Sequence, residues 1–269
     1  MPGGRAALPV GGGLVGVVVT VLILLLGGGG YSVDSPFEQF PSQPASGGST
    51  MDNAPDADSE LVDFSSFVVR DLQKFWAADF QKAGRSFTPT RLVLFRQRTP
   101  TGCGEGSSAT GPFYCPLDRK IYLDLGFFRE LAQRFQAPGD FAQAYVIAHE
   151  YGHHVQTLTG VTKQVDDATR ENSDQRNALS VRTELQADCL AGVWAHSTFE
   201  RGLLEQGDLE EGLTAASSVG DDRIQEQATG TIDKESWTHG SAEQRMKWFN
   251  TGFKQGSLQA CDTFGASAP

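Results

Sequence analysis

The sequence feature that most constrains the fold is a pair of histidines four residues apart, in the segment His149-Glu150-Tyr151-Gly152-His153. The surrounding residues, Phe141 to Thr159, have a helical pattern. Residues four apart lie one above the other on a helix, so both imidazoles can face one metal ion while Glu150 reaches the adjacent position. A hydrolytic zinc site usually takes three protein ligands and leaves one position for water, so another part of the chain must supply a third ligand. The alternative is a chance match in a purely structural helix.

A second helix, predicted from about Asn177 to Phe199, contains two acids with the same spacing, Glu184 and Asp188. We interpret Glu184 as the third ligand and Asp188 as the acceptor that holds the ring NH of His149. Both could instead be solvated surface acids. Close packing against another helix is favoured by the small residues of this segment, Ala187, Ala191 and Gly192.

Other side chains compete for the same role. His154 is turned about 100 degrees around the helix from His153, so we expect a packing or surface role for it. His196 lies too far along the second helix from Asp188 to join the cluster. Cys189 could bind zinc, but a disulfide is favoured for it. The remaining histidine, His239, precedes a helix that is predicted to start at Ser241.

Four stretches together resemble the neutral zinc metallopeptidases of bacterial envelopes, over about residues 60 to 262. They are GPFYCPLDRKIYLDLGFF from Gly111, AHEYGHHVQTLTG from Ala148, ELQADCLAG from Glu184 and THGSAEQRMKWF from Thr238. That family looks like a set of gluzincins, in which a glutamate is the third zinc ligand. The resemblance therefore implies the same role for Glu184, a zincin-like fold and a peptidase reaction, and it implies no particular substrate.

The chemistry predicted from these residues is hydrolysis of peptide bonds by zinc-activated water. Zinc on His149, His153 and Glu184 would polarise the peptide carbonyl, and Glu150 would act as general base. His239 is the candidate donor to the oxyanion. Alternative donors are Tyr122, Tyr151 and Arg245, and the strand Lys120 to Leu125 is a candidate sheet edge for binding an extended peptide.

Two other functions stay open. One is a zincin-like binding module without turnover, against which Glu150 argues because a structural zinc site needs four ligands and no base. The other is a zinc hydrolase that cleaves a non-peptide amide of the cell envelope.

The N-terminal sequence predicts that the rest of the chain is exported across a membrane. No charged side chain lies between Arg5 and Asp34, and residues 14 to 26 read LVGVVVTVLILLL. This stretch is long enough to span a bilayer, so an uncleaved anchor in 1–30 is favoured over a removed signal peptide. The only nearby positive charges precede the span, which leaves the rest of the chain outside the cytoplasm in both cases.

A linker and one folded domain are predicted to follow this anchor. Residues 31–58 are rich in Gly, Ser, Pro, Asp and Gln, which is typical of a flexible linker, although a loosely packed arm is an alternative. The domain is predicted over 59–264. The net charge of −11 excludes a nucleic-acid-binding protein, because phosphate binding requires clustered Lys and Arg.

The chain has four cysteines, at 103, 115, 189 and 261. In an exported domain two disulfides are expected, and we favour Cys103 with Cys115 and Cys189 with Cys261 among the three pairings. Buried free thiols are the alternative.

The pattern along the domain predicts an α+β fold dominated by helices, with a small sheet. Helices are expected over about 60 to 82, 127 to 135, 141 to 159 and 177 to 199, and strands over 91 to 95 and 120 to 125. Capping boxes are expected at three helix starts: Asp140 with Gln143, for the helix over 141 to 159, and Asp208 with Glu211 and Ser241 with Gln244, for two further helices.

Overall fold

The computed structural model of the 269-residue protein describes residues 57–267 and 269. The predicted anchor in 1–30 and nearly all of the predicted linker in 31–58 lie outside these residues, so both remain predictions. Within the described part, no helix has the length and apolar character needed to cross a bilayer.

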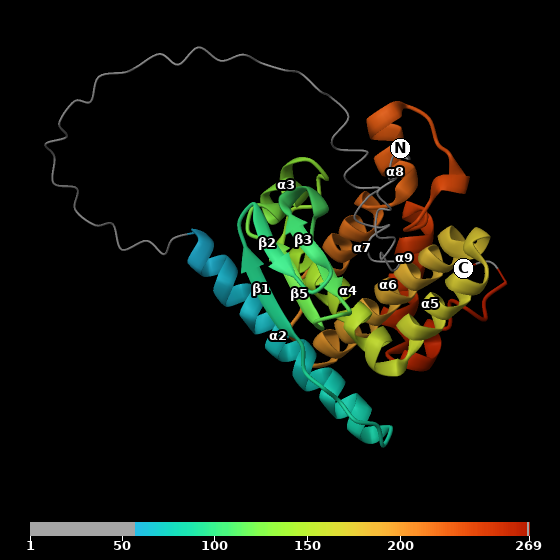
Figure 1. The fold of residues 1–269 in the computed structure, drawn as a ribbon. Coiled ribbons are helices and arrows are strands. Elements are labelled where there is room, and N and C mark those ends of the chain that lie inside the picture. Colours follow the sequence, from blue (N-terminus) through green and yellow to red (C-terminus); the bar gives the residue numbers. More distant parts are fainter. Residues whose placement is uncertain (1–56, 268) are drawn as a thin grey trace, which may run out of the picture.

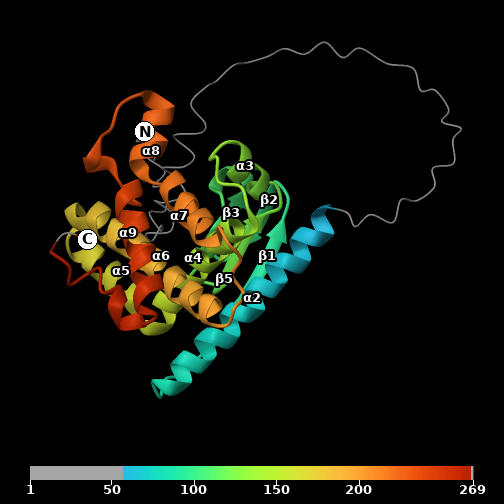
Figure 2. The ribbon, with the colours of Figure 1, turned by 180° about the vertical axis from the view of Figure 1, so that it is seen from behind.

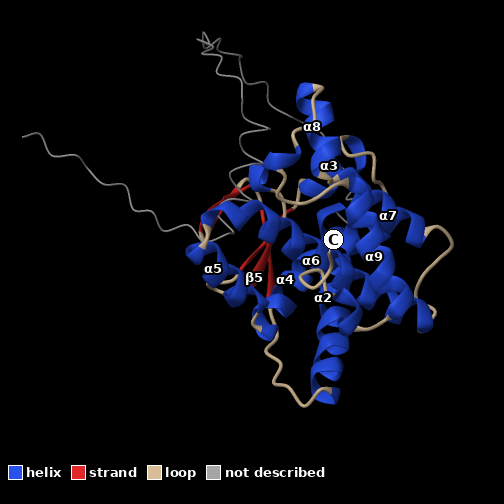
Figure 3. Ribbon diagram, turned by 90° about the vertical axis from the view of Figure 1, so that its right-hand side faces the viewer, coloured by secondary structure: helices blue, strands red, loops and turns tan. Residues whose placement is uncertain are grey.

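The described chain is an α+β structure in which helices predominate and the strands gather in one region (Figures 1 and 3). The helices are α2 (Ala57–Lys82), α3 (Phe127–Gln133), α4 (Asp140–Thr159), α5 (Val161–Glu171), α6 (Arg176–Glu200), α7 (Asp208–Ser218), α8 (Asp221–Thr229) and α9 (Ala242–Gln255). The strands are β1 (Arg91–Phe95), β2 (Arg98–Thr101), β3 (Gly104–Ser107), β4 (Phe113–Cys115) and β5 (Lys120–Asp124).

The predicted helices and both predicted strands are present, within a few residues at each end. The sequence did not predict β2, β3, β4, α5 or α8. These strands have three or four residues each, which is too short for a period of two to stand out. Helix α5 was missed because Gly160, which ends α4 with a φ of 90°, is followed at once by the next helix.

Three strands form one sheet in the order β1-β5-β4, with β1 parallel and β4 antiparallel to β5. The prediction that Lys120 to Leu125 forms an edge was therefore wrong, because β5 pairs on both sides. The sequences of such short strands do not predict which strand lies in the middle of the sheet. The edges of this sheet are β1 and β4.

Alternate residues of the sheet face two different clusters, as expected for a period of two. Ile121 and Leu123 of β5 join the main core, which contains the buried residues of α2 and α4. Tyr122 faces the opposite side and stacks on Phe113, with the ring centroids 5.1 Å apart. The β2–β3 hairpin covers this side, since a Cβ on Gly106 would lie 2.7 Å from the Phe113 ring.

Helix α6 lies between α4 and α9 (Figures 1 and 2), and glycines set both contacts. On the α4 side, a Cβ on Gly152 would lie 3.0 Å from the backbone of Ala187. On the α9 side, Cβ atoms on Gly192 and Gly252 would lie 2.0 Å from Phe249 O and 1.9 Å from Cys189 O. The small residues of α6 therefore do pack closely, against two helices rather than one.

Of the three expected capping boxes, only that of α9 is present, where Ser241 and Gln244 bond to each other's backbone amides. The prediction that Asp140 and Asp208 are N-caps was wrong. Each is the first residue within its helix, and the N-cap is the glycine before it. At the start of α4 the amide of Phe141 donates instead to Glu211 of α7. A cap supplied by a distant helix has no local sequence pattern.

The disulfides join Cys103 to Cys115 and Cys189 to Cys261, the pairing favoured from the sequence. The first ties the β2–β3 hairpin to the end of β4. The second ties α6 to the turn η4 (Leu258–Cys261) after α9. No free cysteine is present among the described residues.

Gly252→Ala tests the close contact between α6 and α9. We expect the free energy of unfolding to fall by about 2–3 kcal/mol, because the new methyl group must displace the backbone of α6. The higher helix propensity of alanine, up to about 1 kcal/mol, does not offset this loss. Urea unfolding measures the change, with Lys254→Ala on the exposed face of α9 as the control. A Gly252→Ala protein as stable as the wild type would contradict the packing described.

Candidate metal centre

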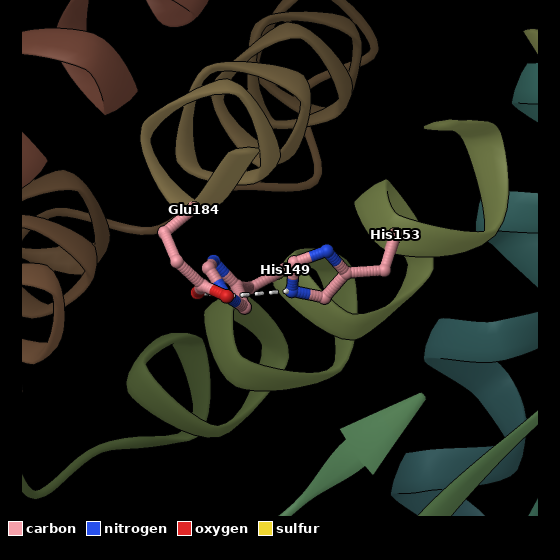
Figure 4. Close-up of side chains that lie close together, drawn as sticks. All are labelled: His149, His153 and Glu184. Atoms are coloured by element: carbon pink, nitrogen blue, oxygen red, sulfur yellow. Dashed lines mark hydrogen bonds and ion pairs between the residues drawn. The ribbon is translucent and has the colours of Figure 1, made fainter. Parts of the chain in front are cut away.

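Three side chains from two helices converge at one point: His149 and His153 of α4 and Glu184 of α6 (Figure 4). One ligand atom from each lies within 4.8 Å of the other two. The Nε2 atoms of His149 and His153 lie 3.1 Å and 3.6 Å from the Glu184 carboxylate oxygens. The close approach of α4 and α6 at Gly152 allows this, because the glycine lies between the two histidines on α4. The structure thus brings together the three residues proposed as ligands from the sequence.

Asp188 lies one turn beyond Glu184 on α6 and accepts a hydrogen bond from His149 Nδ1, at 2.7 Å. This is the contact expected from the sequence. A carboxylate only accepts, so Nδ1 of His149 carries a proton, which leaves Nε2, on the side of Glu184, as the nitrogen that could bind a metal ion. A ring held in this way is typical of a metal-binding histidine.

Asp188 is fully buried and is held by two further side chains. Arg245 of α9 donates to both of its carboxylate oxygens at 2.8 Å, and the Tyr145 hydroxyl donates to Oδ1 at 2.5 Å. Burial opposes the charge on Asp188, but Arg245 and His149 outweigh it and lower its pKa to about 2. Asp188 therefore stays ionised, which keeps the His149 ring in one orientation.

The electrostatics of the three-residue cluster favour a positive charge at its centre. Burial lowers the pKa of His149, but Asp188 and Glu184 more than reverse this and raise it to about 10. The pKa of His153 is also raised, by Glu184 against burial. Burial raises the pKa of Glu184, but the two histidines hold it well below its ordinary value. A buried group of two imidazoles and one carboxylate that stabilises a cation fits a divalent metal ion.

Glu150, the residue after His149, is also buried, and the backbone of Tyr114 on β4 lies close enough to lower its pKa. Burial raises the pKa of Glu150, while His153 and His149 act in the opposite direction. A carboxylate with a raised pKa is a stronger base than one in water.

His239 comes from the loop before α9 and is buried close enough to Glu184 for each to shift the other's pKa. Its Nδ1 contacts Asp221 of α8 at 3.1 Å. The other oxygen of Asp221 accepts the backbone amides of Thr238, His239 and Gly240, at 2.6–2.9 Å. Asp221 thus fixes both the loop and the ring, and Nε2 of His239 has no hydrogen bond to the described residues.

All but one of the other candidates from the sequence are engaged elsewhere. His154 is buried between Tyr114 and the Thr88 carbonyl, which agrees with a packing role. His196 bonds to the Phe253 carbonyl. Of the alternative oxyanion donors, Tyr122 donates to Asp118 and Arg245 to Asp188, while the Tyr151 hydroxyl is buried without a hydrogen-bond partner among the described residues.

A second acidic group, Asp140, Asp208 and Glu211, also has ligand atoms within the same distance of one another. It contains no histidine and is exposed or half-buried. Glu211 already accepts the amide of Phe141, so this group has an evident structural role.

The sequence did not predict how four residues hold the site, and of these only Arg245 was named, as a possible oxyanion donor. Tyr145 and Gln156 lie four residues before His149 and three after His153, so the helical period of α4 could have identified them. The contact of Arg245 with Asp188 and that of Asp221 with His239 join residues that are 57 and 18 positions apart. No local pattern predicts such contacts.

Glu184→Ala should lower the zinc content of the purified protein sharply, because two imidazoles alone remain as ligands. Elemental analysis after dialysis against a fixed zinc concentration measures this, with Glu200→Ala, an exposed position on the same helix, as the control. Unchanged zinc content in Glu184→Ala would remove this residue from the ligand set.

The comparisons with known proteins agree with this site. A family model described as "Putative neutral zinc metallopeptidase" matches residues 1–264. The chain is 48% identical over 221 residues to "Uncharacterized protein YpfJ" of Escherichia coli, a match that covers 81% of this chain and 76% of the relative. It is 47% identical over 192 residues to "Uncharacterized protein Mb2605" of Mycobacterium bovis and "Uncharacterized protein Rv2575" of Mycobacterium tuberculosis, covering 67% of this chain and 64% of each relative. No solved structure is significantly similar to the chain. Since the family match spans nearly the whole sequence, this chain belongs to the neutral zinc metallopeptidase family.

Proposed function

We propose that the protein is a gluzincin-like zinc endopeptidase in which Glu150 is the general base. The observation that carries this proposal is the convergence of His149, His153 and Glu184 at one buried point, with Glu150 beside them on α4. The family is one of zinc peptidases, which agrees with the reaction class.

The donor set fits zinc better than the common alternatives. Calcium and magnesium prefer sites made of oxygen atoms alone, whereas two imidazole nitrogens and a carboxylate are a usual zinc set. All four cysteines are in disulfides, so none offers a thiolate. Three protein ligands leave a position open, as in catalytic zinc sites. When bound there, zinc would polarise the substrate carbonyl and lower the pKa of a coordinated water.

In the proposed reaction, Glu150 accepts the proton of the attacking water on its carboxylate and passes it to the leaving amine. Its burial supports this role, because it raises the pKa of the carboxylate toward the range in which a base works well near neutral pH.

We propose that His239 donates a hydrogen bond from Nε2 to the oxyanion that forms during attack. The contact between its Nδ1 and Asp221 orients the ring, and Asp221 also favours the protonated imidazole. This leaves Nε2 as the donor. A rigid, buried donor stabilises the developing charge without reorganising in the reaction.

We propose that the substrate peptide pairs with β4 and not with β5, the strand considered from the sequence. β4 pairs with β5 on one side only, and Tyr114 of β4 lies close enough to Glu150 to lower its pKa. An extended peptide added at this edge would run close to the base.

The site of action is proposed to be outside the cytoplasm, on a domain attached to the membrane by one N-terminal span. The uncharged stretch between Arg5 and Asp34 supports attachment. The two disulfides support an oxidising compartment.

Glu150→Gln tests the proposed function most simply. We expect peptide cleavage to fall by at least about 10²-fold, because the amide cannot accept the proton, with zinc content unchanged. Cleavage is measured by mass spectrometry on a mixed peptide library, with and without a chelator. Glu130→Gln, an exposed acid on α3, serves as the control.

The outcome also separates the alternatives. A wild-type protein that binds zinc but cleaves no peptide would favour the binding module or the non-peptide amide hydrolase. Full peptide turnover by Glu150→Gln would exclude Glu150 as the base.

His239→Ala should lower kcat by about 10²-fold or more, because the oxyanion loses one donor, and should leave zinc content unchanged. Steady-state kinetics on the best peptide from the library measures this. His196→Ala is the control, since that ring contacts the α9 backbone away from the site. An unaltered kcat would assign the oxyanion contact to another group, and loss of zinc would make His239 a ligand.

A further inference from the structure

The second histidine of the cluster, His153, is held by Gln156, a fully buried residue one turn further along α4. The Gln156 side-chain oxygen lies 2.8 Å from His153 Nδ1. Its side-chain nitrogen donates to the Thr183 carbonyl on α6, at 2.7 Å, and to the Gln186 side-chain oxygen, at 3.1 Å. Every hydrogen of the Gln156 amide therefore has an acceptor on the helix that carries Glu184.

These contacts determine which way the Gln156 amide points. A backbone carbonyl only accepts, so the NH2 group of Gln156 must face Thr183 and its oxygen must face His153. The Nδ1 of His153 must then donate, which leaves Nε2 as the nitrogen that can bind a metal ion. That nitrogen faces the Glu184 carboxylate at 3.6 Å. The backbone carbonyl of Thr183, which lies outside the cluster, thus determines through Gln156 that the proton of His153 is on Nδ1.

The network continues to the C-terminal segment. The Gln186 side-chain nitrogen donates to the Cys261 carbonyl at 2.9 Å. Cys261 is bonded to Cys189, the residue after Asp188. Arg182, one turn before Gln186, donates to the carbonyls of Thr263 and Ala266. One face of α6 therefore binds the C-terminal segment while the face with Glu184 and Asp188 binds the histidines.

We propose that Gln156 is a positioning residue for zinc: it fixes the His153 ring with Nε2 toward the ion and couples this ring to α6 and the C-terminal turn. The proposal rests on the zinc site of the proposed function. It assigns the two histidines different partners, since His149 is held by the charged Asp188 and His153 by a neutral amide. Loss of such a contact typically weakens metal binding 10–100-fold.

A purely structural role for Gln156, as a bond between α4 and α6, makes a different prediction for two substitutions. Gln156→Met removes the acceptor for His153 and also both donors to α6. Gln156→Glu keeps an acceptor for His153 but loses the donors and adds a buried charge beside two oxygens. Stability should therefore fall more in Gln156→Glu, whereas zinc affinity should fall more in Gln156→Met.

The experiment compares full-length wild type, Gln156→Met and Gln156→Glu, with Gln164→Met on the exposed face of α5 as the control. Zinc Kd is measured by competition with a chromophoric chelator, and stability by urea unfolding of the metal-free proteins. We expect a 10–100-fold higher Kd for Gln156→Met, and a Kd for Gln156→Glu close to that of the wild type. The proposal would be overturned if the zinc Kd rose more in whichever variant lost more stability. A wild-type zinc Kd in Gln156→Met would also overturn it.

A measurement on the unsubstituted protein covers the case in which Gln156→Met does not fold. The 15N NMR signals of the zinc-bound protein should show His153 with a proton on Nδ1 and the metal on Nε2. Metal on Nδ1 would overturn the proposal while the proposed function stood. A wild-type protein that binds no zinc would instead refute the proposed function and, with it, this inference.

Discussion

The structure depends on one electrostatic constraint: Glu184 and Asp188 are buried carboxylates that must be neutralised inside the protein. Arg245 pairs with Asp188, and the two imidazoles of α4 face Glu184. This leaves a point between His149, His153 and Glu184 where a positive charge is strongly favoured. The same constraint explains why the cluster needs a rigid frame, because charges in a buried site are costly unless their partners stay in place.

The frame is built around α6, which contacts α4, α9 and the C-terminal segment. Glycines let the helix backbones approach closely, at Gly152 of α4 and at Gly252 of α9, both of which face α6. The Cys189–Cys261 disulfide and the bonds from Arg182 and Gln186 hold the face of α6 that points away from the histidines. The two sides of the cluster are thus supported by parts of the chain that are distant in sequence.

Much of the candidate site could be predicted from the sequence, because its key side chains lie four residues apart on two helices. His149 with His153 and Glu184 with Asp188 follow from helical geometry alone. The even number of cysteines predicts two disulfides but not their pairing, and Cys103 with Cys115 was favoured because it closes a short loop. The sheet order and the cap of α4 could not be predicted, since pairing among short strands and a capping bond from Glu211 depend on tertiary contacts. The contacts of Arg245 with Asp188 and of Asp221 with His239 could not be predicted for the same reason, because each joins residues that are distant in sequence.

The central claim is that two imidazoles and one carboxylate, with no sulfur, bind a single zinc ion. X-ray absorption at the zinc edge of the full-length protein, combined with elemental analysis, tests it most directly. We expect one zinc per chain with nitrogen and oxygen neighbours at about 2.0–2.2 Å and scattering from two imidazole rings. A sulfur neighbour at about 2.3 Å, or a protein that retains no zinc, would contradict it.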